Sequence, residues 1–154
     1  MRHVLERRQT LPIPLRQAWD FFSDPNNLAR ITPPEMGFAI RGPKPEQPTY
    51  AGQRISYTVR PVLGIPLKWV TLITVVDAPH RFVDTQEKGP YALWHHTHTF
   101  AECAEGTVMH DRVEYALPFG ILGELAHRTF VKRQLAGIFS YREKVLKELF
   151  PEKK

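Results

Sequence analysis

Two histidines and an aspartate are predicted to share the inner face of one β-hairpin. Side chains alternate across a strand, so every second residue of 94–100 and of 109–115 points to the same side. One of the two resulting faces is polar throughout and suits water. The opposite, inner face carries Trp94, His96, His98, Phe100, Met109, Asp111, Val113 and Tyr115. Ionisable groups are costly to bury among apolar side chains, so the imidazoles and the carboxylate require a chemical explanation.

The turn of this hairpin sets the register of its two strands. A tight turn at 104–105 would pair Cys103 with Gly106. The same register places His98 opposite Asp111, with Cβ atoms about 4.5–5.5 Å apart, which is close enough for a hydrogen bond or an ion pair. A shift of two residues would keep the inner face but give His98 another partner, so the pairing stays open at this point.

Four kinds of chemistry fit the inner polar set. His98 and Asp111 could satisfy each other as a structural pair in a packed interior. They could also form the polar end of a ligand cavity, because such cavities are mostly apolar with a few placed polar groups. Two histidines and a carboxylate match a metal-ligand set as well. Finally, an aspartate that orients a histidine is an arrangement for acid–base catalysis.

The sequence supports these alternatives unequally. No cysteine pair and no His-Glu-x-x-His motif accompanies the histidines, so we predict no metal ion and no other cofactor. No separate activated nucleophile is present, which leaves His98 and Asp111 as candidate catalytic residues only. The structural-pair interpretation and the ligand-site interpretation are compatible with each other. The predicted ligand-binding residues are Trp69, Phe82, Asp84, Trp94, His96, His98, Phe100, Asp111, Val113 and Tyr115.

Other elements are predicted to position the hairpin. A strand over 3–11 precedes a helix with an apolar stripe at i, i+3, i+4 and i+7 from Leu15, and a second short helix follows over 24–31. From residue 36 to 117 the pattern is typical of β-strands joined by short turns, interrupted by a proline-rich loop over 43–48. This order predicts an antiparallel meander.

The apolar period changes from two to about 3.6 residues after Gly120, which predicts a long helix to about Phe150. At 1.5 Å per residue, about thirty residues would span roughly 45 Å and cross an entire sheet. Gly123 and Gly137 are candidate positions for a bend in this helix.

Composition narrows the class of protein. The 154 residues fit a single domain over 1–154, and the lone Cys103 excludes an internal disulfide. The net charge of +5 is spread without any long basic run, so we expect no nucleic-acid partner. No apolar run of about 18 residues occurs, so we expect no stable membrane insertion. The amino terminus lacks an apolar signal core, which predicts a cytoplasmic protein. We expect a monomer or a weak homodimer.

The order of elements resembles the helix-grip fold of the START-like superfamily, also called SRPBCC, which includes polyketide cyclases and the birch-pollen allergen type. The resemblance covers essentially the whole chain. An uncharacterised bacterial ligand-binding branch is similar in the spacing of Phe82-Val83-Asp84-x-Gln86, Gly89-Pro90-Tyr91, Trp94-His95-His96-x-His98-x-Phe100, Gly106-Thr107, Asp111-x-Val113-x-Tyr115 and Pro118-Phe119-Gly120-x-x-Gly123. The resemblance implies an α+β fold. In it, a curved antiparallel sheet of about six to seven strands wraps around a long C-terminal helix, with two short helices after the first strand.

The resemblance also implies a cavity between the sheet and the C-terminal helix. We expect this cavity to bind a small hydrophobic ligand, either lipid-like or aromatic and polyketide-like, with His96, His98 and Asp111 at its polar end. An enzyme of the cyclase, dehydratase or hydrolase type that uses His98 and Asp111 is one alternative. An accessory module that acts through protein contacts is another.

Overall fold

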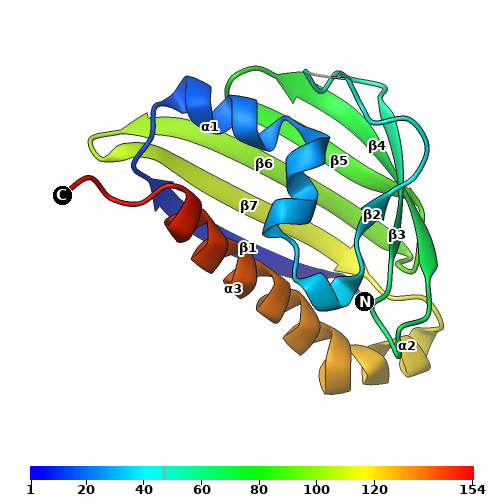
Figure 1. The fold of residues 1–154 in the computed structure, drawn as a ribbon. Coiled ribbons are helices and arrows are strands. Elements are labelled where there is room, and N and C mark those ends of the chain that lie inside the picture. The colour runs from blue at the N-terminus through cyan, green and yellow to red at the C-terminus, as the bar shows by residue number, and fades with distance from the viewer. Residues whose placement is uncertain (47) are drawn as a thin grey trace.

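A curved antiparallel sheet forms the frame of the computed structural model, which describes residues 1–46 and 48–154 (Figure 1). Within those residues the sheet has seven strands in the order β1-β7-β6-β5-β4-β3-β2. The strands are β1 (His3–Leu11), β2 (Ala39–Ile40), β3 (Arg54–Val59), β4 (Leu67–Asp77), β5 (Arg81–Lys88), β6 (Leu93–Cys103) and β7 (Gly106–Ala116). The predicted fold class and the predicted first strand are confirmed. The last strand of the chain, β7, pairs with the first strand, β1, which lies at one edge of the sheet.

Short helices follow the first strand, as predicted. They are α1 (Leu15–Phe22) and two 3-10 helices, η1 (Pro25–Ile31) and η2 (Pro34–Met36). The Asp24 carboxylate accepts a hydrogen bond from the backbone N–H of Asn26 and so caps η1. Within the predicted loop over 43–48, residue 47 lies outside the described residues, and the others form no regular element.

The C-terminal segment is helical over 120–149, and its geometry changes in the middle. It consists of α2 (Gly120–Ala126), a π-helical turn η3 (His127–Val131) and α3 (Lys132–Leu149). The Thr129 hydroxyl donates a hydrogen bond to the Leu125 carbonyl, 2.9 Å away, within this irregular turn. The irregularity therefore lies at η3, where the Thr129 hydroxyl bonds to the Leu125 carbonyl, and not at the candidate positions Gly123 in α2 or Gly137 in α3.

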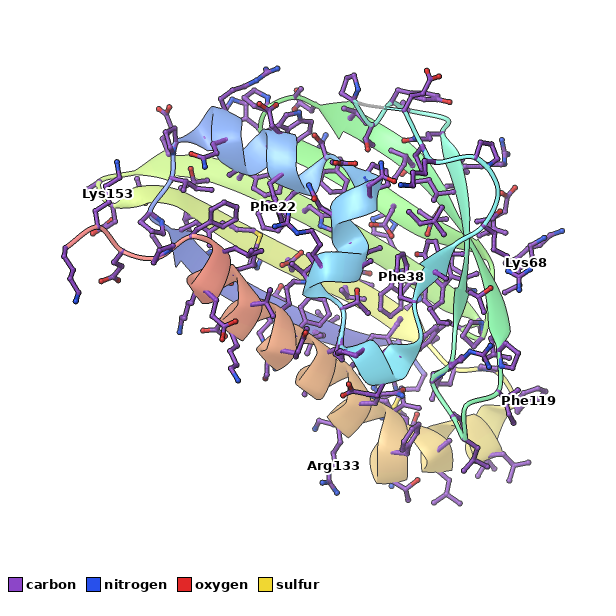
Figure 2. The ribbon with its side chains drawn as sticks, viewed as in Figure 1. Phe22, Phe38, Lys68, Phe119, Arg133 and Lys153 are labelled. Atoms are coloured by element: carbon purple, nitrogen blue, oxygen red, sulfur yellow. The ribbon has the colours of Figure 1, made fainter. Side chains whose placement is uncertain are left out.

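Among the described residues, two clusters of apolar side chains attach the helices to the sheet. In the first, α1 packs on β6 through Trp19, whose ring meets Phe82 and Phe100 edge-on at centroid distances of 5.8 and 5.9 Å. In the second, Leu135 and Phe139 of α3 pack on the inner side chains of β7. Figure 1 shows α3 running along the β1–β7 side of the sheet. Figure 2 shows side chains filling much of the space between the helices and the strands, with Phe22 and Phe38 pointing inward. Among the residues described, no helix combines the length and the apolar character that a membrane crossing requires.

Two glycines of the C-terminal segment provide a matched test of this packing. A Cβ on Gly123 would lie 2.0 Å from the backbone oxygen of Pro118, whereas a Cβ on Gly137 would meet nothing within 4 Å. We predict that Gly123→Ala lowers the free energy of unfolding by about 1–3 kcal/mol, because the backbone must shift. Gly137→Ala should instead raise it by about 0.5–1 kcal/mol, because alanine restricts the unfolded chain. Urea denaturation measures both, and equal effects of the two substitutions would contradict the packing.

Candidate functional site

The register of the hairpin places the polar residues as the sequence predicted. Between β6 and β7, Cys103 pairs with Gly106 and His98 pairs with Asp111. On the other side of β6, Asp84 of β5 pairs with His96. The histidine strand is therefore flanked by one carboxylate on each neighbouring strand. All four side chains point to the inner side of the sheet.

The short hydrogen bonds join each carboxylate to the histidine diagonal to it. The Nε2 atom of His96 lies 2.8 Å from Oδ1 of Asp111, and Nε2 of His98 lies 2.7 Å from Oδ2 of Asp84. The expected contact between His98 and Asp111 is also present, with Nδ1 and Oδ1 3.2 Å apart. The two imidazole rings stack at a centroid distance of 3.6 Å. On a twisted sheet, long side chains can also reach residues that lie diagonally on the neighbouring strand. The shortest hydrogen bond of a side chain is therefore not always to the residue directly opposite in the register.

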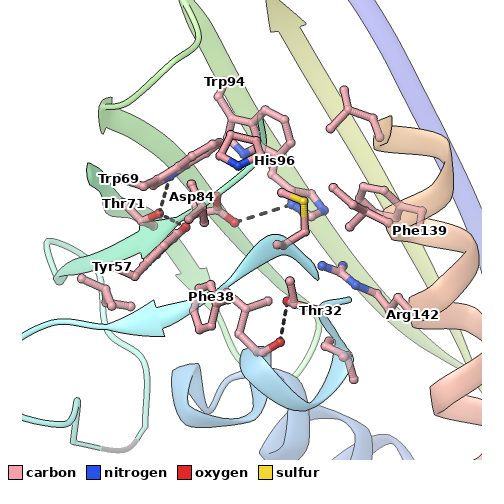
Figure 3. A pocket seen from close by; sticks show the side chains of 18 of the residues that line it. Thr32, Phe38, Tyr57, Trp69, Thr71, Asp84, Trp94, His96, Phe139 and Arg142 are labelled. Carbon is pink, nitrogen blue, oxygen red and sulfur yellow. Dashed lines mark hydrogen bonds and ion pairs between the residues drawn. The ribbon is translucent and has the colours of Figure 1, made fainter. Parts of the chain in front are cut away.

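Arg142 of α3 joins the cluster from the opposite wall and was not predicted (Figure 3). Its Nη1 atom lies 3.8 Å from Oδ1 of Asp111, and its guanidinium group lies 4.7 Å from the ring centroid of Phe139. The residue is only 8% exposed, and its Nε has no hydrogen-bond partner among the described atoms. Its position could have been found in the sequence, because the buried positions of α3 are Leu135, Phe139, Arg142 and Leu146. A charged residue on such a stripe is a signal in itself.

The geometry indicates that His98 carries a positive charge. Both of its ring nitrogens face carboxylate oxygens, so both can donate only in the imidazolium form. Burial by itself lowers the pKa of His98, but the contacts with Asp111 and Asp84 and their negative charges outweigh it and raise the pKa above its usual value. Burial likewise raises the pKa of both carboxyl groups. The histidines and Arg142 reverse this effect, moderately at Asp84 and strongly at Asp111.

His96 is the neutral member of the pair. Burial, followed by the positive charge of His98, lowers the pKa of His96 despite its hydrogen bond to Asp111. Its Nε2 then donates to Asp111, and its Nδ1 keeps a lone pair, since Asp84 Oδ2 lies 3.8 Å away. The cluster thus contains two carboxylates, one imidazolium and one guanidinium. These charges balance, which reduces the cost of burying them.

A cavity of about 360 Å³ lies beside this cluster. Its walls are formed by the inner faces of β3–β6, by the segment from α1 to η2 and by α3. Figure 3 shows Trp69, Trp94, Asp84 and His96 on the strand side, with Phe139 and Arg142 facing them from α3. The polar groups of Tyr57 and Trp69 are both hydrogen-bonded to the Thr71 hydroxyl, at 2.7 and 3.1 Å. That part of the wall is therefore effectively apolar.

The structure places six of the ten predicted site residues along the cavity: Trp69, Phe82, Asp84, Trp94, His96 and His98. Among the residues described, the lining does not include the other four, so their predicted placement is corrected. Phe100 packs beneath α1, 5.4 Å from the ring centroid of Phe22. Val113 and Tyr115 pack beneath α3. Asp111 lies behind the two histidines, which it contacts. The physical reason is that α3 covers the inner side chains of β7, whereas α1 covers the part of β6 that contains Phe100.

The cavity wall also contains residues that strand parity did not indicate. The segment from α1 to η2 contributes Phe21, Leu28 and Met36, and β3 contributes Ile55 and Tyr57. These side chains approach the histidines only through the folding of distant segments. Their apolar character was visible in the sequence, but nothing local indicated that they face the same space.

Among the residues that the structure describes, two clusters have the composition of a metal site. The ligand atoms of Asp84, His96 and His98 lie within 4.8 Å of one another, and so do those of His3, Glu124 and His127. In the first cluster both nitrogens of His98 are engaged by carboxylates. In the second, the rings of His3 and His127 stack at 3.5 Å with an interplanar angle of 15°. In-plane lone pairs of nearly parallel stacked rings do not converge on one point, so neither arrangement is preorganised for a cation.

Comparisons with known proteins agree with this architecture. The family model described as "Polyketide cyclase / dehydrase and lipid transport" matches residues 2–149. No curated protein sequence matches the chain. Protein CV1439 from Chromobacterium violaceum superposes with a TM-score of 0.71 at 16% identity, over 98% of this chain and 99% of that one. TTHA0849 from Thermus thermophilus gives 0.69 at 18% identity, over 96% and 95%. Ara h 8.0201 gives 0.66 at 17% identity, over 96% and 99%.

The match over nearly the whole chain establishes the family. The chain belongs to the polyketide cyclase/dehydrase and lipid transport family, within the START-like proteins that the sequence motifs resembled. The solved structures share less than a fifth of their residues with it, so their likeness concerns the fold.

The charge state of the histidine pair leads to a prediction about pH. Because its folded pKa is raised, His98 contributes stability that is complete below about pH 6.5 and is lost as pH rises through the folded pKa. His96 has a lowered pKa, so stability is also lost as pH falls below about 6.5 through its folded value. We therefore expect this pair to give a stability maximum near pH 6.5, measurable by urea denaturation at several pH values.

Site-resolved NMR titration tests the origin of that maximum. Asp84→Asn should lower the pKa of His98, because it removes the carboxylate 2.7 Å from Nε2, and should weaken the loss of stability at high pH. His95→Gln on the opposite face of β6 serves as the control and should change neither titration. A parent His98 that titrates below His96 would show that the charge lies on the other ring.

The metal hypothesis has its own measurement. We predict that elemental analysis of the purified protein finds no stoichiometric zinc, iron or manganese, because occupation would require breaking the bonds between histidines and carboxylates. A stoichiometric metal that is lost in His96→Ala and retained in His95→Ala would contradict this prediction.

Proposed function

We propose that the protein binds one small, mostly apolar ligand in the cavity and orients it through an oxygen atom at the polar side. A volume of about 360 Å³ lies within the range of small-molecule sites, which is about 300–1,000 Å³. The walls supply aromatic and aliphatic surface for the body of such a ligand. The family description, which includes lipid transport, supports the same class of function.

The observation that carries this proposal is the state of Arg142. Its side chain lines the cavity, its Nε–H is buried without a protein acceptor among the described residues, and an unsatisfied buried donor costs about 1–3 kcal/mol. A carbonyl, carboxylate or hydroxyl oxygen of a ligand would remove that cost and gain a charge-assisted hydrogen bond. The Arg142 Nη1 atom lies 3.8 Å from Oδ1 of Asp111, which is too long for a hydrogen bond, so this contact is an ion pair that does not use up the donors of the guanidinium group. The ligand class is therefore an acyl chain or a ring system that carries an oxygen at one end.

Acid–base catalysis on the bound ligand is a second candidate function, and one observation favours it. His96 lines the cavity, donates from Nε2 to Asp111 and retains a lone pair on Nδ1. An aspartate that fixes the tautomer of a histidine in this way prepares the free nitrogen to accept a proton. The base in such a reaction would be His96 with Asp111 as its orienting group. His98, the histidine first expected in that role, has both nitrogens engaged.

Fluorescent probe binding tests the ligand proposal. We predict that cis-parinaric acid and 8-anilinonaphthalene-1-sulfonate, which both join an apolar body to an anionic oxygen group, bind to the delipidated protein. Arg142→Met should weaken both by about tenfold or more, because it removes a charge-assisted hydrogen bond but keeps the apolar stem. Lys144→Met, an exposed cation on the same helix, serves as the matched control and should bind like the parent.

Native mass spectrometry of freshly purified protein provides an independent measurement. A retained small-molecule mass supports the proposal. Absence of any retained mass together with absence of probe binding would contradict it. Turnover of a supplied ketone or polyketide that is lost in His96→Gln, but not in His95→Gln, would instead establish the catalytic candidate.

A further inference from the structure

A group of large apolar side chains is exposed at one end of the molecule. Leu63 is 92% exposed, Phe119 82%, Ile121 88% and Leu122 72%. Val62, which precedes Leu63, and Phe130 of η3 are 44% and 43% exposed and also line the cavity. We call these six residues the apolar rim. Exposed apolar clusters of this kind mark interaction surfaces on proteins that otherwise bury such side chains.

The rim is assembled from two segments that are far apart in the sequence. One is the turn between β3 and β4, and the other runs from the end of β7 through η3. The first turn of α3, which directly follows the second segment, is tied to the first segment, because the Gln134 side-chain amide donates a hydrogen bond to the Pro61 carbonyl, 2.6 Å away. Figure 1 shows the β3–β4 turn next to α2, and Figure 2 shows Phe119 pointing outward at that end. The rim therefore lies next to the part of the cavity that Val62 and Phe130 line.

Backbone strain accompanies two of the most exposed side chains of the rim, Leu63 and Phe119. Among the described residues, Leu63 with φ of 50° and Phe119 with φ of 69° are the two non-glycine residues in the left-handed region. This conformation is unfavourable for branched and aromatic residues, and asparagine or glycine would adopt it more easily. Residues held in strained conformations cluster at functional positions. At both turn tips a large apolar side chain is thus presented to solvent at a conformational cost.

Positive charges accompany the rim. The segments 59–68 and 117–133 contain Arg60, Lys68, Arg128, Lys132 and Arg133, but only one acidic residue, Glu124. The Glu124 carboxylate is contacted by His3 at 3.1 Å and by Arg128 at 3.6 Å. Arg60 is held beside the first turn by its hydrogen bond to the Gly64 carbonyl. An apolar centre with a cationic surround complements an anionic surface that has an apolar interior.

We propose that the apolar rim docks on the surface of a lipid membrane that contains anionic lipids. Apolar side chains enter the boundary between headgroups and acyl chains, and Lys and Arg side chains pair with anionic headgroups. A second copy of this chain fits less well, because a symmetric contact would bring the same cations of both copies together. Docking would point the cavity end at the acyl layer. This last consequence rests on the proposed function, whereas docking itself does not.

Vesicle co-sedimentation tests the proposal on the full chain without added ligand. The parent should sediment with vesicles of phosphatidylcholine and phosphatidylglycerol at 7:3, sediment weakly with phosphatidylcholine alone, and be released by added sodium chloride. The double variant Leu63→Asn/Phe119→Asn should lose about tenfold or more of its partitioning. Asparagine tolerates positive φ, so this variant is expected to fold. Tyr50→Asn, an exposed aromatic outside the rim, is the matched control and should partition like the parent.

Two results would overturn the proposal. One is a parent protein that fails to sediment with the anionic vesicles, or a double variant that sediments as well as the parent. The other is a parent dimer in analytical ultracentrifugation that the double variant dissociates, which would identify the rim as a self-association surface. Arg142→Met separates this proposal from the ligand proposal, because it lies within the cavity and should leave vesicle partitioning unchanged.

Discussion

The buried ion cluster on three adjacent strands is the constraint on which the rest of the site depends. Asp84, His96, His98 and Asp111 occupy an inner sheet face that is otherwise apolar, and Arg142 approaches them from α3. Removal of any one of these charges would leave another charge buried without a partner. The free-energy cost of such an unpaired buried charge is larger than the net stabilisation that an intact ion pair provides. The cluster therefore ties the register of β5, β6 and β7 to the position of the helix. It also fixes which groups of the cavity wall are polar.

The local parts of this arrangement could be predicted, because they depend on residues close in sequence. The tight turn at 104–105 and the alternation of polar and apolar residues determine the register of the β6–β7 hairpin, so His98 was expected opposite Asp111 and is found there. The change of apolar period after Gly120 predicted the long C-terminal helix, and the family resemblance supplied the curved antiparallel sheet on which it packs. What parity could not supply is the diagonal pattern of hydrogen bonds. That pattern depends on strand twist and on where the second carboxylate, Asp84, lies.

The non-local parts could not be predicted from one sequence. Alternation assigns Val113 and Tyr115 to the inner face, but only the path of α3 decides that this part of the face is packed and not hollow. Met36 and Ile55 reach the cavity through the folding of segments that are distant from the histidines. Arg142 is the intermediate case. Its charge on a buried helical stripe was visible in the sequence, yet its partner Asp111 lies 31 positions earlier, and only the fold brings them together.

The basic residues also group differently along the sequence and in the folded structure. Read along the chain, the basic residues stand singly or in short groups, which argued against an extended anionic partner. In the structure, the turn that contains Arg60 and the segment that contains Lys132 meet at one end, around side chains as exposed as Leu63 and Ile121. The interior is charge-balanced and the opposite wall of the cavity is apolar, so the excess positive charge lies on the surface. Because the buried charges of this chain sum to zero, its net positive charge lies at the surface, where a partner molecule can contact it.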